Sequence, residues 1–321
     1  MALKDQVLSL LLTGEYLSGE SAAKKLGVSR TAVWKAVEAL RQDGCKIEAV
    51  TNRGYILVNE NLLSEGSVRC FLPDKLHDMP IYVYKSVTST NDVAKEAAEA
   101  GRQDAVFIAN EQTSGRGRMG RKFISEANRG VYMSFLLHPG CPAEDSALLT
   151  TAAAVAVCRA AESVADVTCG IKWVNDVCIK EKKLAGILCE GAFGFESGQL
   201  DYAIVGIGTN IKAGAFPDEI ADRATSLETE AGVIISRSRY AAALIEAVVS
   251  VFSDFSSGSF MDEYRARSFV TGRRIRVNCG TESYEANAEY ITDRGALVAS
   301  LPGGERRTLS SGEVSIIPIG N

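Results

Sequence analysis

The stretch Ser114-Gly115-Arg116-Gly117-Arg118-Met119-Gly120-Arg121-Lys122 places three glycines and four cationic side chains within nine residues. A loop of this composition brings backbone N–H groups close to an anion and surrounds the anion with positive charge. Its glycine spacing also matches a dinucleotide-binding fingerprint, but that fingerprint requires a helix directly after the loop. Instead, residues 131–137 form an apolar run typical of a strand. We therefore predict an anion-binding loop, with a solvated basic turn as the alternative.

Strand-like and helix-like segments alternate around this loop, from about residue 81 to residue 270. Apolar runs predict strands at 81–84, 106–109, 131–137, 184–190 and 202–208, and a strand-like stretch at 171–179 that breaks at Asn175-Asp176. Helical spacing predicts helices at 89–100, 147–163 and 240–252. We expect a side chain of Ser89, Thr90 or Asn91 to cap the first of these helices, and residues 181–183 to form a charged turn. The irregular order favours a mixed sheet with helices on one face, an α+β layer fold.

The beginning of the chain predicts a winged helix-turn-helix domain. Gly27-Val28-Ser29 forms a tight turn between two short amphipathic helices, and Ser29 is placed to cap the second helix. Two alternating runs, 47–50 and 55–58, flank Thr51-Asn52-Arg53-Gly54 and predict the hairpin known as the wing.

The charge of this domain favours DNA binding. Residues 21–58 carry seven Lys or Arg and three acids, although the whole chain has a net charge of −5. A cationic module on an acidic protein is expected where phosphates are bound. We expect the second helix to enter the major groove and Arg53 to meet the DNA backbone, with the groove-facing residues being Ser29, Arg30, Thr31, Trp34 and Lys35. The alternative is a protein-interaction or dimerisation module.

The end of the chain changes character. Short strands are predicted at 273–277, 284–290, 296–301, 306–309 and 314–317, and glycine-containing turns separate several of them. Five short strands in about 50 residues predict a small β-barrel, which we expect to be SH3-like. We therefore predict three domains, at residues 1–65, 66–270 and 271–321.

Cysteine and hydropathy patterns limit the possible functions. The eight cysteines include no C-x-x-C pair, which argues against a zinc site. The beginning of the chain reads as an amphipathic helix, so we expect a cytoplasmic protein with reduced thiols. The uncharged part of the helical segment near residue 150 is too short to span a bilayer, so it predicts a buried helix and no membrane association.

The central segment offers cations and neutral polar groups but no conventional nucleophile system. The two histidines, His77 and His138, lie outside any Ser or Cys nucleophile motif. This pattern suits a reaction in which a substrate carboxylate attacks a nucleotide phosphate. Such a reaction is accelerated mainly by positioning and charge stabilisation.

Five motifs, in this order, resemble those of the biotin–protein ligases: Ser89-Thr90-Asn91, the run from Gly115 to Arg121, Lys172-Trp173-Val174-Asn175-Asp176, the run from Lys183 to Leu188, and the run from Gly206 to Ile211. With the winged helix in front, the chain resembles the bifunctional kind that also represses biotin genes. The resemblance covers essentially the whole chain and implies a central domain related to class II synthetases.

The resemblance implies an activity and partners. The activity is the ATP-dependent formation of biotinyl-5′-adenylate, followed by transfer of biotin to a lysine of the biotin carboxyl carrier protein of acetyl-CoA carboxylase. ATP, biotin and Mg²⁺ are the implied small molecules, with biotinyl-5′-adenylate as the corepressor. Operator DNA, the carrier protein and, when ligand is bound, a second copy of the chain are the implied partners.

The resemblance also implies roles for single residues. Biotin would be bound by Ser89, Thr90, Asn91, Gln112, Arg116, Gly117, Arg118, Ser134, Lys183 and Gly186, of which Arg116, Arg118 and Lys183 would be catalytic. ATP and the adenylate would contact Arg118, Arg121, Lys172, Trp173, Asn175, Asp176 and Asn210, and Asp176 would also hold Mg²⁺. The segment 211–226 has few evident anchors, and we expect it to be mobile until ligand binds.

The chain departs from the family pattern at two positions. Val174 stands where proline is usual, and Phe123 stands where tryptophan is common. Two other functions remain open at this point. One is a lipoate-type protein ligase, against which the winged helix argues. The other is a non-enzymatic repressor that senses a small acid, which the Arg/Gly loop and Lys183 disfavour.

Overall fold

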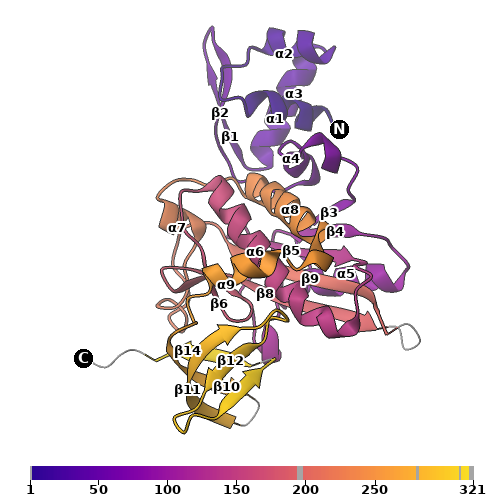
Figure 1. The fold of residues 1–321 in the computed structure, drawn as a ribbon. Helices are drawn as coiled ribbons and strands as arrows, with labels where there is room; N and C mark the ends of the chain where they lie inside the picture. The colour runs from indigo at the N-terminus through magenta and orange to yellow at the C-terminus, as the bar shows by residue number, and fades with distance from the viewer. Residues whose placement is uncertain (1, 194–197, 280–281, 311, 318–321) are drawn as a thin grey trace.

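The computed structural model describes residues 2–193, 198–279, 282–310 and 312–317. Three units follow one another along the chain (Figure 1). The N-terminal helices and hairpin lie at one end, a layered α+β domain lies in the middle, and a small sheet lies at the other end. The predicted order of domains is therefore present in the structure.

The N-terminal unit is a helix-turn-helix with a hairpin, as predicted. Ser18 and Ser29 cap the second and third helices by accepting hydrogen bonds from backbone N–H groups, and Gly27 ends the second helix with a φ of 67°. The elements are α1 (Leu3–Leu11), α2 (Gly19–Leu26), α3 (Arg30–Gln42) and the antiparallel strands β1 (Cys45–Val50) and β2 (Gly54–Glu60). Apolar side chains from all three helices and from β1 form its core.

A short connector joins this unit to the central domain. It contains α4 (Glu65–Arg69) and a 3-10 turn, η1 (Asp74–Leu76). Ser64 and Ser67 form a capping box at the start of α4. Leu62 still packs into the core of the N-terminal unit, whereas Val68 belongs to the core of the central domain.

The central domain is built on a mixed sheet. Its strands are β3 (Ile81–Tyr84), β4 (Ala105–Ala109), β5 (Gly130–Leu137), β6 (Gly170–Lys172), β7 (Asp176–Ile179), β8 (Lys182–Phe193) and β9 (Leu200–Asn210). Their order in the sheet is β3-β4-β5-β9-β8-β7-β6. β3 and β4 are parallel, and the other neighbours are antiparallel. The prediction of a mixed sheet is confirmed.

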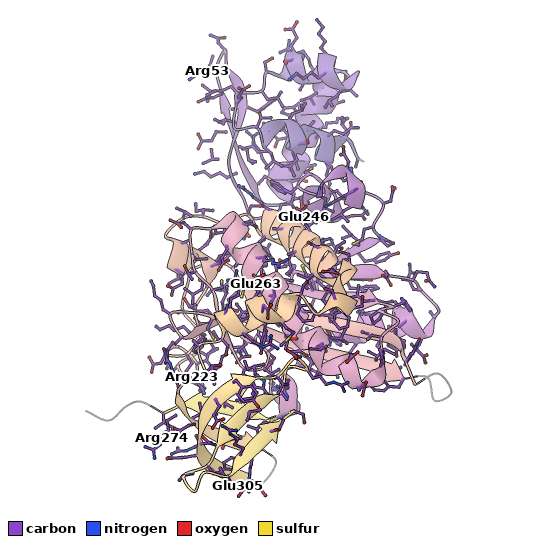
Figure 2. The ribbon with its side chains drawn as sticks, viewed as in Figure 1. Arg53, Arg223, Glu246, Glu263, Arg274 and Glu305 are labelled. Atoms are coloured by element: carbon purple, nitrogen blue, oxygen red, sulfur yellow. The ribbon has the colours of Figure 1, made fainter. Side chains whose placement is uncertain are left out.

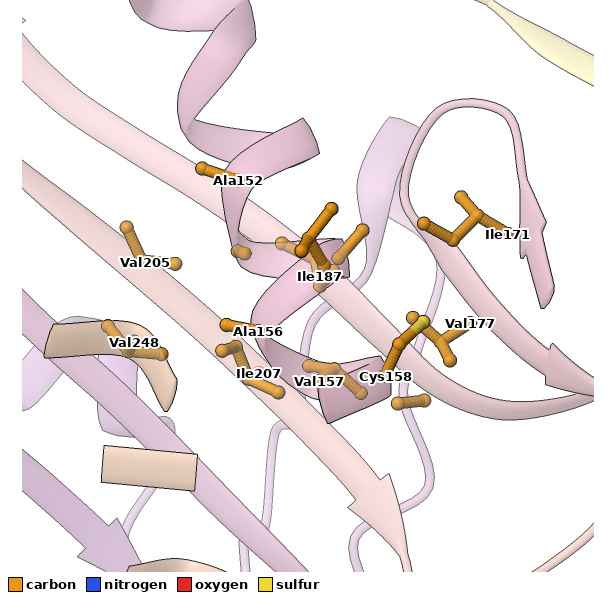
Figure 3. Close-up of a cluster of buried hydrophobic side chains, with 14 of the residues drawn as sticks. Ala152, Ala156, Val157, Cys158, Ile171, Val177, Ile187, Val205, Ile207 and Val248 are labelled. Atoms are coloured by element: carbon orange, nitrogen blue, oxygen red, sulfur yellow. The ribbon is translucent and has the colours of Figure 1, made fainter. Parts of the chain in front are cut away.

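Helices cover both faces of this sheet, so the prediction of helices on one face is wrong. α6 (Ser146–Val164) and α8 (Arg237–Ser253) pack on the face that carries Val205 (Figure 3). α5 (Thr90–Glu99) packs on the opposite face, against Ile204. Because successive strand residues point to opposite faces, these neighbouring residues belong to two separate cores. The apolar pattern of a strand cannot tell which face a short helix will cover.

α6 is the central core helix. Among the described residues, it is the one helix long and apolar enough to cross a membrane by length and composition, and 61% of its apolar window is buried inside the fold. The prediction of a buried helix is therefore confirmed. The remaining helices are α7 (Leu227–Ala231) and α9 (Phe260–Arg267), with 3-10 turns η2 (Arg118–Gly120), η3 (Ala143–Asp145) and η4 (Phe255–Ser257).

The C-terminal unit is an antiparallel sheet with the strand order β13-β12-β11-β10-β14. The strands are β10 (Arg274–Cys279), β11 (Glu282–Ile291), β12 (Leu297–Ser300), β13 (Arg306–Leu309) and β14 (Glu313–Ile316), in agreement with the five predicted strands. The unit is joined to the central domain by the Trp173 indole N–H, which donates a hydrogen bond to the Gly295 carbonyl at 2.9 Å.

Candidate functional site

Glycines on one face of the sheet let the protein's own side chains approach the strands closely. Gly186 of β8 and Gly208 of β9 are cross-strand partners, and Gly206 lies on the same face of β9. Ile207 points to the opposite face and joins the α6 and α8 core. A Cβ at position 206 would lie 2.1 Å from the Asn91 side-chain oxygen, and one at position 208 would lie 2.5 Å from the Phe123 ring. The three glycines line a cleft with a volume of about 140 Å³.

The cleft brings together most of the residues that the sequence predicts for the site. Those that line it are Ser89, Thr90, Asn91, Gln112, Arg116, Gly117, Arg118, Arg121, Lys172, Trp173, Asn175, Asp176, Lys183 and Gly186. Ser134 and Asn210 do not line it. Gly312 and Val314 do line it, although the sequence patterns did not indicate them.

Neutral polar groups converge at one end of the cleft. The Gln112 side-chain oxygen accepts hydrogen bonds from the backbone N–H and the hydroxyl of Thr90, at 2.8 and 3.1 Å. The Gln112 side-chain nitrogen donates to the Ser125 hydroxyl at 2.8 Å. Ser89 is the N-cap residue of α5, but its side chain makes no capping hydrogen bond, so this predicted cap is wrong. Gln112 satisfies an N–H group at the helix start in its place.

Ser134 lies beneath these groups. Its side chain is fully buried, and its hydroxyl contacts the Thr90 hydroxyl at 2.7 Å and the Asn91 side-chain oxygen at 2.6 Å. In the structure Ser134 therefore contacts the two residues above it, and its contact with biotin stays a prediction. The Asn91 side-chain nitrogen continues the network by donating to Glu190 at 2.6 Å.

The Arg/Gly loop folds back on itself. The Gly117 N–H donates to the Arg121 carbonyl at 2.7 Å, and the Phe123 N–H donates to the Gly115 carbonyl at 2.9 Å. A Cβ at position 115 would lie 2.4 Å from the Phe123 carbonyl oxygen, so only glycine fits there. The short turn η2 forms the tip, and the next strand or helix along the chain is β5. The predicted order of loop and then strand is confirmed.

Two arginines of this loop point to different partners. Arg116 pairs with Asp92 of α5 at 2.6 Å and with Glu190 of β8 at 3.2 Å. The guanidinium therefore meets two carboxylates of the protein itself, whereas the sequence predicted a substrate carboxylate. Arg118 reaches across the cleft instead, and donates to Asn175 at 3.3 Å and to the Gly312 carbonyl at 3.5 Å.

Lys183 lies opposite the neutral end of the cleft. β8 begins at Lys182, so the predicted turn is wrong for residues 182 and 183, which both lie in the strand. The Lys183 ammonium pairs with the Asp176 carboxylate at 2.6 Å. A Cβ at position 186 would lie 3.0 Å from the Lys183 Cε, so Gly186 leaves space for the lysine. Burial raises the pKa of the nearby Cys178 thiol to about 12, which excludes it as a nucleophile near neutral pH.

The turn between β6 and β7 supplies the floor at this end. Trp173 and Val174 are both buried, and the peptide bond between them is cis. The Val174 carbonyl accepts a hydrogen bond from the Tyr264 hydroxyl at 3.0 Å. Asn175 donates to the Ile187 carbonyl at 3.0 Å, which fixes its side chain at the edge of the cleft.

The segment 211–226 has more anchors than the sequence suggested. The Arg129 guanidinium donates to the Ala213 carbonyl at 2.9 Å, and the Asn210 side chain donates to the Thr225 carbonyl at 3.1 Å. The expectation of few anchors is therefore wrong. Asn210 holds this segment and does not line the cleft, and its contact with the adenylate stays a prediction.

The N-terminal unit presents the residues predicted for DNA contact. Ser29 caps α3, and the exposed residues that follow on this helix are Arg30, Thr31, Trp34 and Lys35. The Trp34 side chain is 52% exposed, so it is not a core residue. Arg53 lies at the tip of the hairpin, far from the central domain (Figure 2), and stacks 4.0 Å over the Tyr16 ring.

Family models and known proteins match the chain along nearly its whole length. A model for the biotin/lipoate A/B protein ligase family matches residues 83–210, an HTH domain model matches residues 4–56, and a biotin protein ligase C-terminal domain model matches residues 270–316. Bifunctional ligase/repressor BirA of Bacillus subtilis (strain 168) is 34% identical over 306 residues, covering 92% of this chain and 93% of that protein. The protein of the same name from Escherichia coli (strain K12) is 25% identical over 304 residues, covering 93% and 92%.

A solved structure of biotin protein ligase from Aquifex aeolicus, in complex with biotin and ATP, superposes with a TM-score of 0.63 at 28% identity. The match covers 74% of this chain and 98% of that one. The match to the Bacillus subtilis protein spans 92% of this chain, and a family model matches each of the chain's three units. The chain therefore belongs to the biotin protein ligase family, within the group of bifunctional ligase/repressors.

Proposed function

We propose that this protein joins biotin to ATP to form biotinyl-5′-adenylate, and then transfers the biotinyl group to a lysine of a biotin carboxyl carrier protein of acetyl-CoA carboxylase. The observation that carries this proposal is the division of one cleft into a neutral polar end and a cationic end. Biotin has the same division, because its fused ring with a ureido group is uncharged and its side chain ends in a carboxylate.

The neutral end would bind the ureido ring. Thr90 and Gln112 are already held by hydrogen bonds to each other, and Ser134 supports Thr90 from below. Such fixed donors and acceptors in a hollow suit an uncharged polar ring better than mobile charges do. Ser89 and Asn91 also line the cleft and would border this end, and Gly186 would lie between the ring and Lys183.

The cationic end would bind the reacting groups. The biotin carboxylate oxygen attacks the α-phosphorus of ATP, a new P–O bond forms, and the bond to the β-phosphate oxygen breaks as pyrophosphate leaves. Negative charge is concentrated on the phosphate oxygens during this step, and Arg118 and Lys183, which both line the cleft, would stabilise it. Arg121, Lys172, Trp173 and Asn175 would surround the nucleotide, and Gly117 would let the loop backbone approach it.

The second step needs an acceptor amine. The lysine of the carrier protein attacks the acyl carbon of the mixed anhydride, the amide forms, and AMP leaves with the electron pair of the broken C–O bond. The amine loses a proton in the same step. The same cations would stabilise the departing phosphate, so one site serves both steps.

The cleft fits Mg²⁺ only if the phosphates of the bound nucleotide supply most of its ligands. In the described part of the chain, no group of three or more His, Cys, Asp or Glu side chains could hold a metal ion. Mg²⁺ is commonly held by one or two carboxylates together with substrate phosphates. Asp176 is the carboxylate lining the cleft that would hold it, and the ion would supply charge neutralisation for the leaving pyrophosphate.

The winged-helix unit would bind operator DNA and repress biotin genes, with biotinyl-5′-adenylate as corepressor. The exposed Arg30, Thr31, Trp34 and Lys35 support contact with the major groove, and Arg53 supports a contact with the backbone. Ligand-dependent formation of a homodimer would match two half-sites and raise DNA affinity. We further propose a cytoplasmic location, domain boundaries near residues 65 and 270, a central domain like those of class II synthetases, and an SH3-like barrel at the C-terminal end.

Biotin-dependent exchange between ATP and pyrophosphate tests the ligase activity. The purified protein with Mg²⁺ should exchange label when biotin is present, and Lys183→Ala should lose most of this exchange. Adding lipoate as a competitor separates the lipoate-type alternative, because only a lipoate ligase would use it. DNA binding that responds to biotin and ATP without any exchange would instead identify a non-enzymatic sensor and refute the ligase assignment.

A further inference from the structure

Arg116 anchors the Arg/Gly loop to two carboxylates outside it. The loop is a closed unit, since the backbone bonds between Gly115 and Phe123, and between Gly117 and Arg121, tie its two sides together. Arg116 lies at the base of this unit and is paired with Asp92 and Glu190.

One of these carboxylates also belongs to the polar network at the neutral end of the cleft. The Glu190 Oε2 atom accepts hydrogen bonds from Asn91 at 2.6 Å and from Arg116 at 3.2 Å. Asn91 is 4% exposed and is held from below by Ser134. An unbroken series of contacts therefore runs from the groups proposed to read biotin to the base of the loop.

The other side of the loop reaches the far wall of the cleft. Arg118 donates to Asn175 and to the Gly312 carbonyl of the C-terminal unit. The loop thus spans the cleft and is held at both sides. The loop is held at one side by Arg118 and at the other by the ion pairs of Arg116. The Arg116 side involves no residue proposed to bind the nucleotide, so it can be changed without altering the nucleotide site.

We infer that Asp92 and Glu190 are positioning residues that hold the loop closed over the acyl-adenylate through Arg116. This inference rests on the proposed function, because it concerns how long the reactive intermediate stays in the cleft. A mixed anhydride reacts with water and with any amine, so it has to be retained until the acceptor lysine arrives. Neither carboxylate touches the reacting atoms in this role.

The sequence alone offered no way to find this pair. Asp92 reads as an ordinary acid in the first turn of a helix, and Glu190 reads as a polar residue near the end of a strand. Their meeting with Arg116 depends on the first turn of α5 lying close to β8, which joins segments 98 residues apart in the chain. The two ion pairs are partly exposed, with side chains 38–44% accessible, so each one should contribute modestly.

The first test does not need catalysis. Trypsin cuts after Arg and Lys, and it should cut within the loop of the unliganded protein when the loop opens. Asp92→Asn and Glu190→Gln should each be cleaved there about 1.5- to 5-fold faster than the parent, the range expected from losing one exposed ion pair. Glu99→Gln is the matched control, because Glu99 lies on the same helix and, among the described residues, forms an ion pair only with Lys95, at 3.9 Å. Loop cleavage at the parental rate in both variants would overturn the inference.

The second test follows the intermediate. Biotinyl-5′-adenylate is formed on the full-length protein from labelled biotin and ATP, and its release is followed after a chase with unlabelled biotin. Asp92→Asn should release it about 1.5- to 5-fold faster, with a rate of formation within about twofold of the parent, and Asp92→Glu should restore the parental release rate. Slower formation without faster release would refute the inference, because it would make Asp92 part of the chemistry.

The third test uses salt concentration to distinguish loss of the Arg116 ion pairs with Asp92 and Glu190 from a general loosening of the loop. Salt screens exposed ion pairs, so release from the parent should accelerate between about 0.05 and 0.5 M salt. The Asp92→Asn, Glu190→Gln double variant should be fast throughout and nearly independent of salt. If the parent forms no adenylate but the variants are still cleaved faster by trypsin, the ligase assignment fails, whereas the role of Asp92 and Glu190 in holding the loop stands. An equal salt dependence of release in the parent and the double variant would refute that role.

Discussion

Replacing Arg237 with methionine should strongly destabilise the central domain. Arg237 is 1% exposed, and its guanidinium donates to the side chain and carbonyl of Asn61, both at distances below 2.9 Å. It also donates to the side chains of Asn110 at 2.7 Å and Asn128 at 3.3 Å, and to the Gly130 carbonyl at 3.3 Å. The Arg237 side chain thus joins the connector, at Asn61, to the end of β4, at Asn110, and to residues 128–130 at the start of β5.

The size of the effect follows from the acceptors left behind. Methionine fills much of the arginine volume but offers no donor, so several buried oxygens lose their partner. Each such orphan costs about 1–3 kcal/mol, and water entering the space recovers part of this, so we expect a total loss of about 3–5 kcal/mol. At roughly 2–4 °C per kcal/mol, the midpoint of thermal unfolding should fall by about 10 °C.

Urea unfolding followed by tryptophan fluorescence measures this loss. The two tryptophans report on different units, because Trp173 is buried in the central domain and Trp34 is exposed on α3. Arg239→Met is the matched control, since this arginine lies on the same helix but is exposed. A loss below about 1 kcal/mol for Arg237→Met, or an equal loss for the control, would refute the reasoning.

Three further predictions concern the cleft, its neighbouring segment and the winged helix. Gly206→Ala would place a Cβ 2.1 Å from the Asn91 side-chain oxygen, so the displaced amide should weaken biotin binding about tenfold or more, measured by calorimetry. Burial raises the pKa of Glu228, but its bonds to Lys212 and to two backbone N–H groups lower it more, so the pKa is below 4.5. Its stabilisation is therefore full above about pH 4.5 and is lost as pH falls, and Glu228→Gln should flatten that acid dependence of the unfolding midpoint. Lys35→Ala should weaken DNA binding and lower the slope of log affinity against log salt by about one if the lysine meets a phosphate, and an unchanged slope would contradict that contact.

Local patterns were sufficient for the elements and for most of the cleft. Caps, apolar periodicity and glycine turns act over a few residues, so the helix-turn-helix, the hairpin and the core helix α6 could be placed from the sequence. The cleft residues also lie in short motifs at strand ends and loop bases. A motif keeps its residue types together in the chain, which is why Thr90, Gln112, Arg118 and Lys183 could be named beforehand.

The errors share a physical cause, which is that partners supplied by distant segments decide what a polar side chain does. The Ser89 side chain does not cap α5, because the Gln112 side chain, which follows β4, accepts the hydrogen bond from an N–H group at the start of the helix. Ser134 alternates to the same face as the cleft but lies under α5, so its hydroxyl contacts Thr90 and Asn91 from below. Arginine is a residue type that often binds a substrate anion, but the Arg116 guanidinium forms ion pairs with Asp92 and Glu190, which no local sequence pattern links to it. The composition of a cationic loop indicates that it can bind anions. Which of its arginines bind a ligand and which bind protein carboxylates is decided only when the fold brings acids such as Asp92 and Glu190 close to them.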